Sequence, residues 1–275
     1  MKVSGTDLIV DLEPGTGMLG QHQLDDPPRL SLDLGPRREP TPVPTNDTTP
    51  ILRPTIHPIV IDPGHGGTDV GATTPTGVEE KDLVLAVAKR VSAILRSRGF
   101  PTHLTREGDI GRALTDRTSL ANRLEARAFV SLHANASPYS SARGAETYYM
   151  SLEKGATDEH AAATAKLENQ SAGADGPRDG LDLILWDMAQ AEVMNESSHL
   201  ALSVQRHLNT LPGVPDRGVK QAPFVVLTGA TMPAILVEVG FLTNPDEAGR
   251  LEDPAYQDRV ARAIADGIVD FLGGA

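Results

Sequence analysis

From residue 57 onward, apolar residues recur with two alternating periods that predict strands followed by helices. Apolar runs at 59–62, 128–132 and 234–238 are short, continuous and bounded by polar or turn residues, as in buried strands. Three further short runs predict the remaining strands: 102–105, 146–150 and 224–227.

Helical spacing separates these strands. Between Glu79 and Arg98 the apolar residues fall on one face, and Gly99 supplies a stop signal. The pattern predicts four more helices, at 113–127, 157–170, 196–211 and 254–272. We therefore expect an α/β fold, with a mostly parallel twisted sheet and helices on both faces, forming one domain over 57–275.

The first part of the chain has a different pattern. Apolar and polar residues alternate in part at 7–12 and 29–34, which predicts two strands with a loop between them. Two strands do not make an independent sheet, so 1–35 is interpreted as the remnant of a β-rich module. Proline occurs at nine positions between 27 and 58, and 36–56 is therefore predicted to be an extended linker.

Composition narrows the classes of function. A formal charge of −12 argues against nucleic-acid binding, which depends on Lys and Arg. The absence of Cys excludes thiol nucleophiles, disulfides and cysteine-ligated zinc. No apolar run approaches the ~20 residues of a membrane-spanning helix. The first residues lack the apolar core of a signal peptide, so we expect either a protein that is not exported or a trimmed fragment.

Polar residues that can bind a metal follow three of the predicted strands or begin a helix. His65 and His133 come just after apolar runs, Glu238 ends a third, and Glu80 begins a helix. The carboxyl ends of strands in an open α/β sheet collect binding sites. Two imidazoles and one carboxylate form a common catalytic zinc set, and a further glutamate could accept a proton.

Each of these residues also has an ordinary structural interpretation. His65 could be a hydrogen-bonded loop residue, and Glu80 or its neighbour Glu79 could simply favour the helix dipole. Glu238 and His133 are harder to explain in this way, because a carboxylate or imidazole after four or five apolar residues is costly to bury without a partner. Together the four residues favour a metal site.

Five segments, in order, resemble the signature segments of the zinc-dependent N-acetylmuramoyl-L-alanine amidases, the bacterial cell-wall amidases of the cell-separation type. These segments are Asp62-Pro63-Gly64-His65-Gly66-Gly67, Glu79-Glu80-Lys81-Asp82, Leu104-Thr105-Arg106, Ser131-Leu132-His133-Ala134-Asn135 and Val237-Glu238-Val239-Gly240-Phe241-Leu242-Thr243-Asn244. The resemblance covers about 57–273, and 24–34 resembles the last strand of the wall-targeting module that precedes many such amidases.

The resemblance implies a peptidoglycan hydrolase that cleaves the amide between N-acetylmuramic acid and L-alanine. It implies one Zn²⁺ on His65, Glu80 and His133, with Glu238 as the catalytic carboxylate. Glu80 is preferred to Glu79 because the family's ligand directly precedes Lys-Asp. Arg106 and Asn135 are candidates for substrate or ligand-supporting contacts. The resemblance also implies a periplasmic or cell-envelope location.

The resemblance raises a hypothesis about control as well. Some family members carry an inserted helix that plugs the site until an activator protein displaces it, and 173–198 is the corresponding segment here. Glu168 resembles a position that contacts the zinc in such inhibited forms. The ordinary interpretation of 173–198 is a core-packing helix.

Two alternatives to the amidase remain at this stage. One is a zinc peptidoglycan peptidase with the same fold, which would cut a different bond. The other is a catalytically inactive wall-binding protein, against which the intact set of four residues argues.

Overall fold

The computed structural model divides the chain into two units, Met1–Arg53 and Pro54–Ala275. It describes residues 2–4, 7–9, 16–25, 28–36, 57–151, 155–172 and 182–273. Most of the predicted linker, and residues 173–181 of the predicted regulatory segment, lie outside these described residues.

The described part of the first unit consists of two antiparallel strand pairs. Strand β1 (Lys2–Ser4) pairs with β2 (Asp7–Ile9), and β3 (Thr16–Asp25) pairs with β4 (Pro28–Pro36). The two predicted strands are therefore present as β2 and β4, but each pairs with a strand that was not predicted. The polar and glycine-rich sequence of β3 explains the omission, since it lacks a clear alternation.

The second unit contains a six-stranded sheet in the order β6-β5-β7-β10-β8-β9. Four of its five strand pairings are parallel, and only β10 with β8 is antiparallel. The fold prediction is confirmed. The strands are β5 (Ile59–Pro63), β6 (Thr102–Leu104), β7 (Ala128–Asn135), β8 (Ala145–Met150), β9 (Asp216–Ala222) and β10 (Ala234–Phe241).

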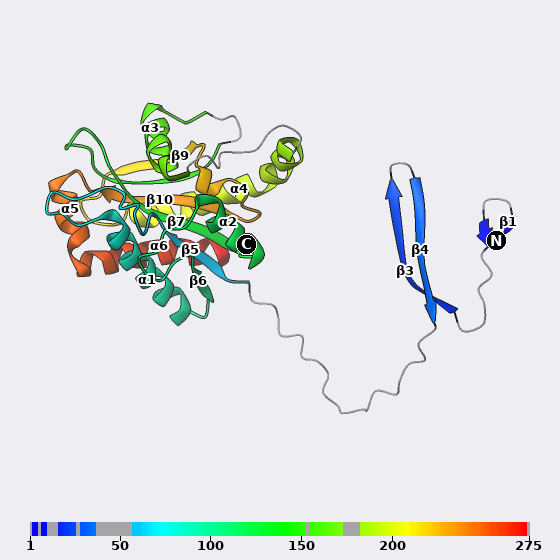
Figure 1. Ribbon diagram of the computed structural model, residues 1–275. Coiled ribbons are helices and arrows are strands. Elements are labelled where there is room, and N and C mark those ends of the chain that lie inside the picture. Colours follow the sequence, from blue (N-terminus) through cyan, green and yellow to red (C-terminus); the bar gives the residue numbers. More distant parts are fainter. Residues whose placement is uncertain are drawn as a thin grey trace, which may run out of the picture. The chain divides into compact units, whose positions relative to one another are not determined.

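Helices cover both faces of the sheet (Figure 1). One face packs against α1 (Glu80–Ser97), α4 (Asp182–Leu208) and α6 (Pro254–Gly273), with a large aliphatic core between the layers. The other face packs against α2 (Leu114–Arg123), α3 (Glu159–Glu168) and the 3₁₀ turn η2 (Val225–Leu227). A short 3₁₀ helix, η1 (Asn169–Ala172), follows α3, and α5 (Pro245–Glu252) precedes α6.

The central strands are buried along their whole length. All eight residues of β7 and all eight of β10 are buried, because both faces of the sheet are covered. The polar residues at the ends of these strands are therefore buried too, and they must be satisfied by other parts of the chain. This requirement concentrates charge at the carboxyl edge of the sheet.

Three local predictions were wrong or missing. The run 224–227 forms a buried 3₁₀ turn rather than a strand, since a short apolar run does not by itself distinguish the two. The strand β9 was not predicted because its sequence, DRGVKQA, is charged and half-exposed, as is common for an edge strand. Helix α5 was also missed, although Asn244 caps it and Pro245 begins it.

Candidate metal centre

The loop after β5 and the carboxyl end of β7 bring the two predicted histidine ligands together. The rings of His65 and His133 lie 4.9 Å apart, centroid to centroid, at an angle of 75°. This approach depends on glycine: a Cβ on Gly64 would lie 2.3 Å from Cε1 of His133. Glycine at position 64 is therefore required for His65 to lie this close to His133 on β7.

Glu80 reaches the same point from the first turn of α1. Its Oε1 accepts a hydrogen bond from the backbone N–H of Ala134, and its Oε2 accepts one from Ala72, at 2.9 and 2.8 Å. Oε1 also lies 3.1 Å from His65 Nε2 and 3.2 Å from His133 Nδ1. The two backbone N–H groups thus hold the carboxylate in a single orientation toward both imidazoles.

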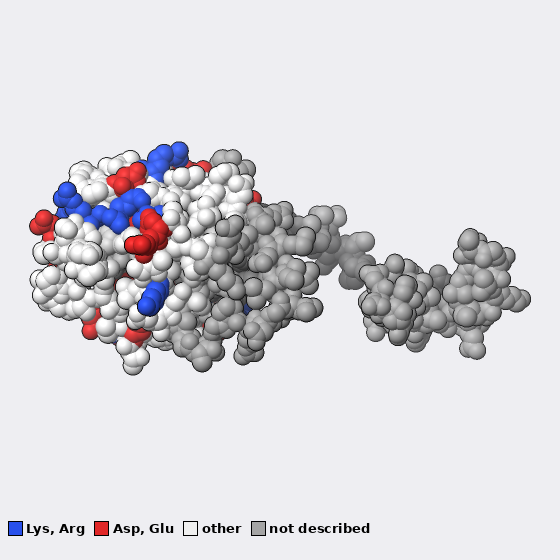
Figure 2. All heavy atoms as spheres, turned by 90° about the horizontal axis from the view of Figure 1, so that it is seen from above, with Lys and Arg blue, Asp and Glu red and all other residues white. Residues whose placement is uncertain are grey.

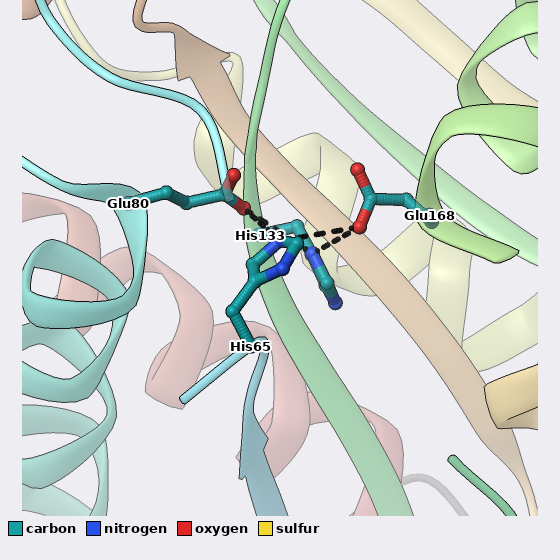
Figure 3. A group of neighbouring side chains, drawn as sticks. All are labelled: His65, Glu80, His133 and Glu168. Atoms are coloured by element: carbon teal, nitrogen blue, oxygen red, sulfur yellow. Dashed lines mark ion pairs between the residues drawn. The ribbon is translucent and has the colours of Figure 1, made fainter. Parts of the chain in front are cut away.

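A fourth side chain, Glu168, enters from the last residue of α3. Its Oε2 lies 2.8 Å from His133 Nδ1 and 3.3 Å from His65 Nε2. Figure 3 shows the four side chains pointing toward one another from the β5 loop, α1, β7 and α3. The four ligand atoms all lie within 4.8 Å of one another, and all four residues are buried.

The spacing of these atoms fits a small divalent cation. A tetrahedral zinc ion with ligands at about 2.1 Å would space neighbouring ligand atoms about 3.4 Å apart. The four N···O distances given above, 2.8–3.3 Å, are close to that value. In addition, His65 Nε2 and His133 Nδ1 are buried atoms without a hydrogen bond. Buried imidazole nitrogens of this kind are suitable metal ligands.

The electrostatics of the group favour positive charge. Burial alone would lower the pKa of His65, but Asp69, Glu168 and Glu80 outweigh it and raise the pKa to about 12. For His133, Glu168 and Glu80 likewise outweigh burial and raise the pKa to about 10. Carboxylates that stabilise a protonated imidazole so strongly would also stabilise a metal cation beside a neutral imidazole.

Asp69 determines which ring nitrogen of His65 faces the candidate metal centre. His65 Nδ1 lies 3.0 Å from Asp69 Oδ1, so this nitrogen carries the proton and leaves Nε2 for the centre. Sequence reasoning did not identify Asp69. The signal was present, because a carboxylate four residues after a candidate ligand in a glycine-rich loop is within reach of its ring.

Two buried arginines hold the loop that carries His65. Arg106 donates to the carbonyl oxygens of Pro63 and Gly64, and also to those of Lys81 and Gly108. Arg117 donates to the carbonyls of Pro63 and His65. Three consecutive carbonyls of the loop therefore accept hydrogen bonds from guanidinium groups. The contacts of Arg106 are to backbone carbonyls around two candidate ligands, so they support the ligand loop.

The charge of Arg117 is balanced by Asp62 at the end of β5. Asp62 is fully buried and accepts hydrogen bonds from Arg117, Ser131 and Thr105. Burial would raise the pKa of Asp62, but Arg117 and the two hydroxyl donors outweigh it and hold this pKa below its usual value. These hydrogen bonds hold the end of β5 against α2 and β7, just before the loop that carries His65.

Glu238 lies in the carboxyl-terminal half of β10, beside His133. The two residues are partners in the parallel register of β10 and β7. Both carboxylate oxygens of Glu238 are buried and have no hydrogen-bond partner. Burial and the neighbouring carboxylates of Glu168 and Glu80 raise the pKa of Glu238 well above its usual value, while His133 opposes the rise. A carboxyl group in such an environment is typical of a proton-transfer site.

Asn135 is buried and does not join the metal group. Its Nδ2 lies 2.9 Å from Glu146 Oε1, and its Oδ1 has no hydrogen-bond partner. Glu146 is paired with Glu238 in the register of β8 and β10, and it is neutralised by Arg217, Lys220 and His160. Sequence reasoning did not identify Glu146, although it is a lone carboxylate in a run of strand-forming residues.

Glu168 could be a fourth ligand of a metal ion in this group. With Glu168 included, the group has four protein ligands, as in structural zinc sites; without it, three ligands remain and one position is open, as in catalytic sites. Glu168 is the last residue of α3 and is followed directly by η1.

The predicted regulatory segment is only partly described. Residues 182–198 form the first part of the continuous helix α4. Ser197 accepts a hydrogen bond from the backbone N–H of Ala234, at the amino end of β10. This contact places Ser197 at the amino end of β10, away from Glu238.

Comparisons with known proteins agree on one family. A family model described as N-acetylmuramoyl-L-alanine amidase matches residues 59–270. N-acetylmuramoyl-L-alanine amidase AmiA of Escherichia coli is 35% identical over 219 residues, which cover 78% of this chain and 75% of AmiA.

Solved structures are similar as well. The amidase AmiC2 of Nostoc punctiforme is 34% identical, with a TM-score of 0.59, over 78% of this chain and 96% of that chain. The CwlD amidase of Clostridioides difficile, in complex with the GerS lipoprotein, is 25% identical, with a TM-score of 0.56, over 80% of this chain and 100% of that chain.

Proposed function

The chain belongs to the N-acetylmuramoyl-L-alanine amidase family, and we propose that it hydrolyses the amide between N-acetylmuramic acid and L-alanine in peptidoglycan at a zinc centre formed by His65, Glu80 and His133. The single observation that carries the zinc assignment is the convergence of two buried imidazole nitrogens without hydrogen bonds on the carboxylate oxygens of Glu80 and Glu168. Hydrolysis of cell-wall amides is the activity named for the family.

A zinc ion held there would act as a Lewis acid, which polarises a carbonyl group and lowers the pKa of a water molecule. Glu238 would accept the proton of the attacking water and then donate it to the departing amine of L-alanine. Its position beside His133, with both oxygens without hydrogen bonds, supports this role. Arg106, Arg117 and Asp69 hold the ligands in place and take no part in proton transfer.

We propose further that Glu168 makes an inhibited form of the centre. Its carboxylate lies where a fourth ligand would complete the set, and so it would compete with water and substrate for the open position. The part of 173–198 that precedes Ser197 would belong to the same device, and an activator protein would displace it. The CwlD amidase in its complex with the GerS lipoprotein is a relative that has a protein partner.

The proposed location is the periplasm or another part of the cell envelope, where the substrate lies. Among the residues that the structure describes, no helix is both long and apolar enough to cross a membrane. The boundaries 1–35, 36–56 and 57–275 stand as our proposal for a wall-targeting remnant, a linker and a catalytic domain.

The decisive experiment combines metal analysis with mass spectrometry of muropeptides from one sample. We expect one zinc per chain and the release of free stem peptides together with peptide-free glycan. Shortened stem peptides that stay attached to glycan would instead indicate the zinc peptidase alternative. Zinc without any cleavage, even after deletion of 177–196, would indicate an inactive wall-binding protein.

A further inference from the structure

A groove runs from the metal group along one side of α3. It has two adjoining hollows. The first, of about 180 Å³, lies against His65, Glu80 and Glu168. The second, of about 410 Å³, lies between α3 and the residues that follow β7. Three residues line both hollows, so the two are continuous: Ala136, Leu167 and Gln170.

The second hollow is built mainly from small and apolar side chains. Ala136 and Pro138 form one wall, only three to five residues beyond His133. Ala163 and Leu167, one helical turn apart on α3, form the other wall, and Leu167 is 40% exposed. An exposed leucine beside a catalytic centre, in a concave surface of this size, is typical of a ligand site.

One cation lies on this apolar groove. Lys166 lines the second hollow and is exposed. Among the residues that the structure describes, no carboxylate pairs with it, in a chain whose formal charge is −12. Figure 2 views the molecule from above Figure 1, where α3 lies, and in the part that is not grey it shows Lys and Arg lying close to Asp and Glu. The groove therefore offers a positive charge at the edge of an apolar surface.

We propose that this groove binds the stem peptide, the leaving side of the substrate, and that Lys166 pairs with a carboxylate of that peptide. The inference rests on the proposed amidase function and assigns one side of its substrate to one side of the centre. The two sides of the scissile amide differ in charge. The sugars beside the lactyl group are neutral, whereas the peptide begins with the methyl side chain of L-alanine and carries at least the carboxylate of its own end. Apolar walls beside a cation that no described carboxylate pairs with complement the peptide.

The matched variants for the groove are on the same helix. Ala163→Trp places a large ring in the second hollow. Ala162→Trp places the same ring next to it, on an exposed position outside the groove lining. Both alanines are exposed, so neither change disturbs the core, and circular dichroism checks the fold. We expect Ala163→Trp to raise KM for a muropeptide at least tenfold, and Ala162→Trp to leave it unchanged.

The variants for the charge are Lys166→Ala, Lys166→Glu and Lys166→Arg, with Lys89→Ala on exposed α1 surface as control. We expect Lys166→Ala to raise KM about threefold to fivefold, as suits an exposed ion pair, with kcat unchanged. We expect Lys166→Glu to raise KM further and Lys166→Arg to restore the KM of the unmodified protein. The difference disappears on a muropeptide whose peptide carboxylates are all replaced by amides.

A binding measurement separates this inference from the proposed function. Isothermal titration calorimetry of the zinc-loaded protein with the free stem tripeptide needs no turnover. Binding that Ala163→Trp and Lys166→Glu weaken, but Ala162→Trp does not, supports the groove. Absence of binding by the unmodified protein, or equal binding by all variants, overturns the groove even if muropeptides are cleaved. A protein that binds the peptide but releases none from muropeptides, even after deletion of 177–196, overturns the amidase function instead.

Discussion

Glu238 and His133 are direct neighbours in the sheet, paired across the parallel register of β10 and β7. Neither residue is near the other in sequence, yet the register places the proposed proton acceptor beside a proposed metal ligand. Both strands are buried on both faces of the sheet, so the carboxylate of Glu238 is shielded from bulk solvent. The carboxylate of Glu238 is thus next to the imidazole of His133, so the proposed proton acceptor and the proposed metal ligand lie side by side.

The first prediction concerns this carboxylate. Glu238→Gln keeps the shape of the side chain but cannot accept the proton. We expect it to bind zinc as the unmodified protein does and to lose about 10²–10⁴-fold in kcat. Metal content and peptide release are measured on the same preparation. Unchanged turnover in a zinc-loaded variant would remove Glu238 from the proposed mechanism.

The second prediction concerns the metal. A ligand that binds only the folded state stabilises it, by about 2.7 kcal/mol when free zinc is 100 times the dissociation constant. We expect zinc to raise the melting temperature of protein stripped by a chelator, and to restore hydrolysis. His133→Ala should show neither response. A melting temperature that zinc leaves unchanged in the unmodified protein would argue against a resident ion.

The third prediction concerns the support of the ligand loop. Arg106 donates four hydrogen bonds to carbonyl oxygens near His65 and Glu80, and a lysine has too few donors in the wrong geometry to replace them. We expect Arg106→Lys to weaken zinc binding about 10–100-fold in chelator competition. Arg123→Lys, on an exposed position of α2, is the control. Equal zinc affinity in both variants would show that the loop keeps its shape without Arg106.

The fourth prediction concerns pH and the buried pair of Asp62 and Arg117. In the folded protein the pKa of Asp62 is lower than its ordinary value of 3.8. The contribution of Asp62 to stability is therefore complete above about pH 3.8, and it is lost as the pH falls through the lower pKa of the folded state. We expect Asp62→Asn to cost about 3–5 kcal/mol near neutral pH, because it leaves Arg117 buried without its partner. Denaturant unfolding at several pH values measures both effects. The variant should lose less stability than the unmodified protein between pH 4 and 2; an equal loss would contradict the assignment.

The fifth prediction concerns Glu168. Glu168→Ala removes the fourth carboxylate and leaves three ligands. If Glu168 blocks the open position, we expect zinc to stay bound, somewhat more weakly, and kcat to rise several-fold on cell walls. Glu159→Ala, at the exposed start of α3, is the control. A lower kcat in the Glu168 variant would instead place this carboxylate among the groups that the reaction needs.

Much of the fold follows from local patterns, because hydrophobic periodicity reports which residues must be buried. The strands at 59–62, 128–132 and 234–238 and the helix from 79 to 98 were predicted within a few residues of their ends. The errors occurred where the local pattern of apolar and polar residues did not match the secondary structure that the segment adopts. Strand β9 is a charged edge strand, and the apolar run at 224–227 is buried as a 3₁₀ turn.

By itself, the sequence determined the α/β architecture and the family, because both depend on ordered local signals that can be recognised without coordinates. It also indicated His65, His133 and Glu238, because polar residues at the ends of apolar runs are costly unless they are used. Glu80 was indicated at the start of a helix, and the resemblance added Glu168. Only the tertiary structure decided that His65, Glu80, His133 and Glu168 share one point, and that Arg106 supports a loop. Those facts depend on strand order, register and the packing of α3, which arise from contacts between residues far apart in the chain.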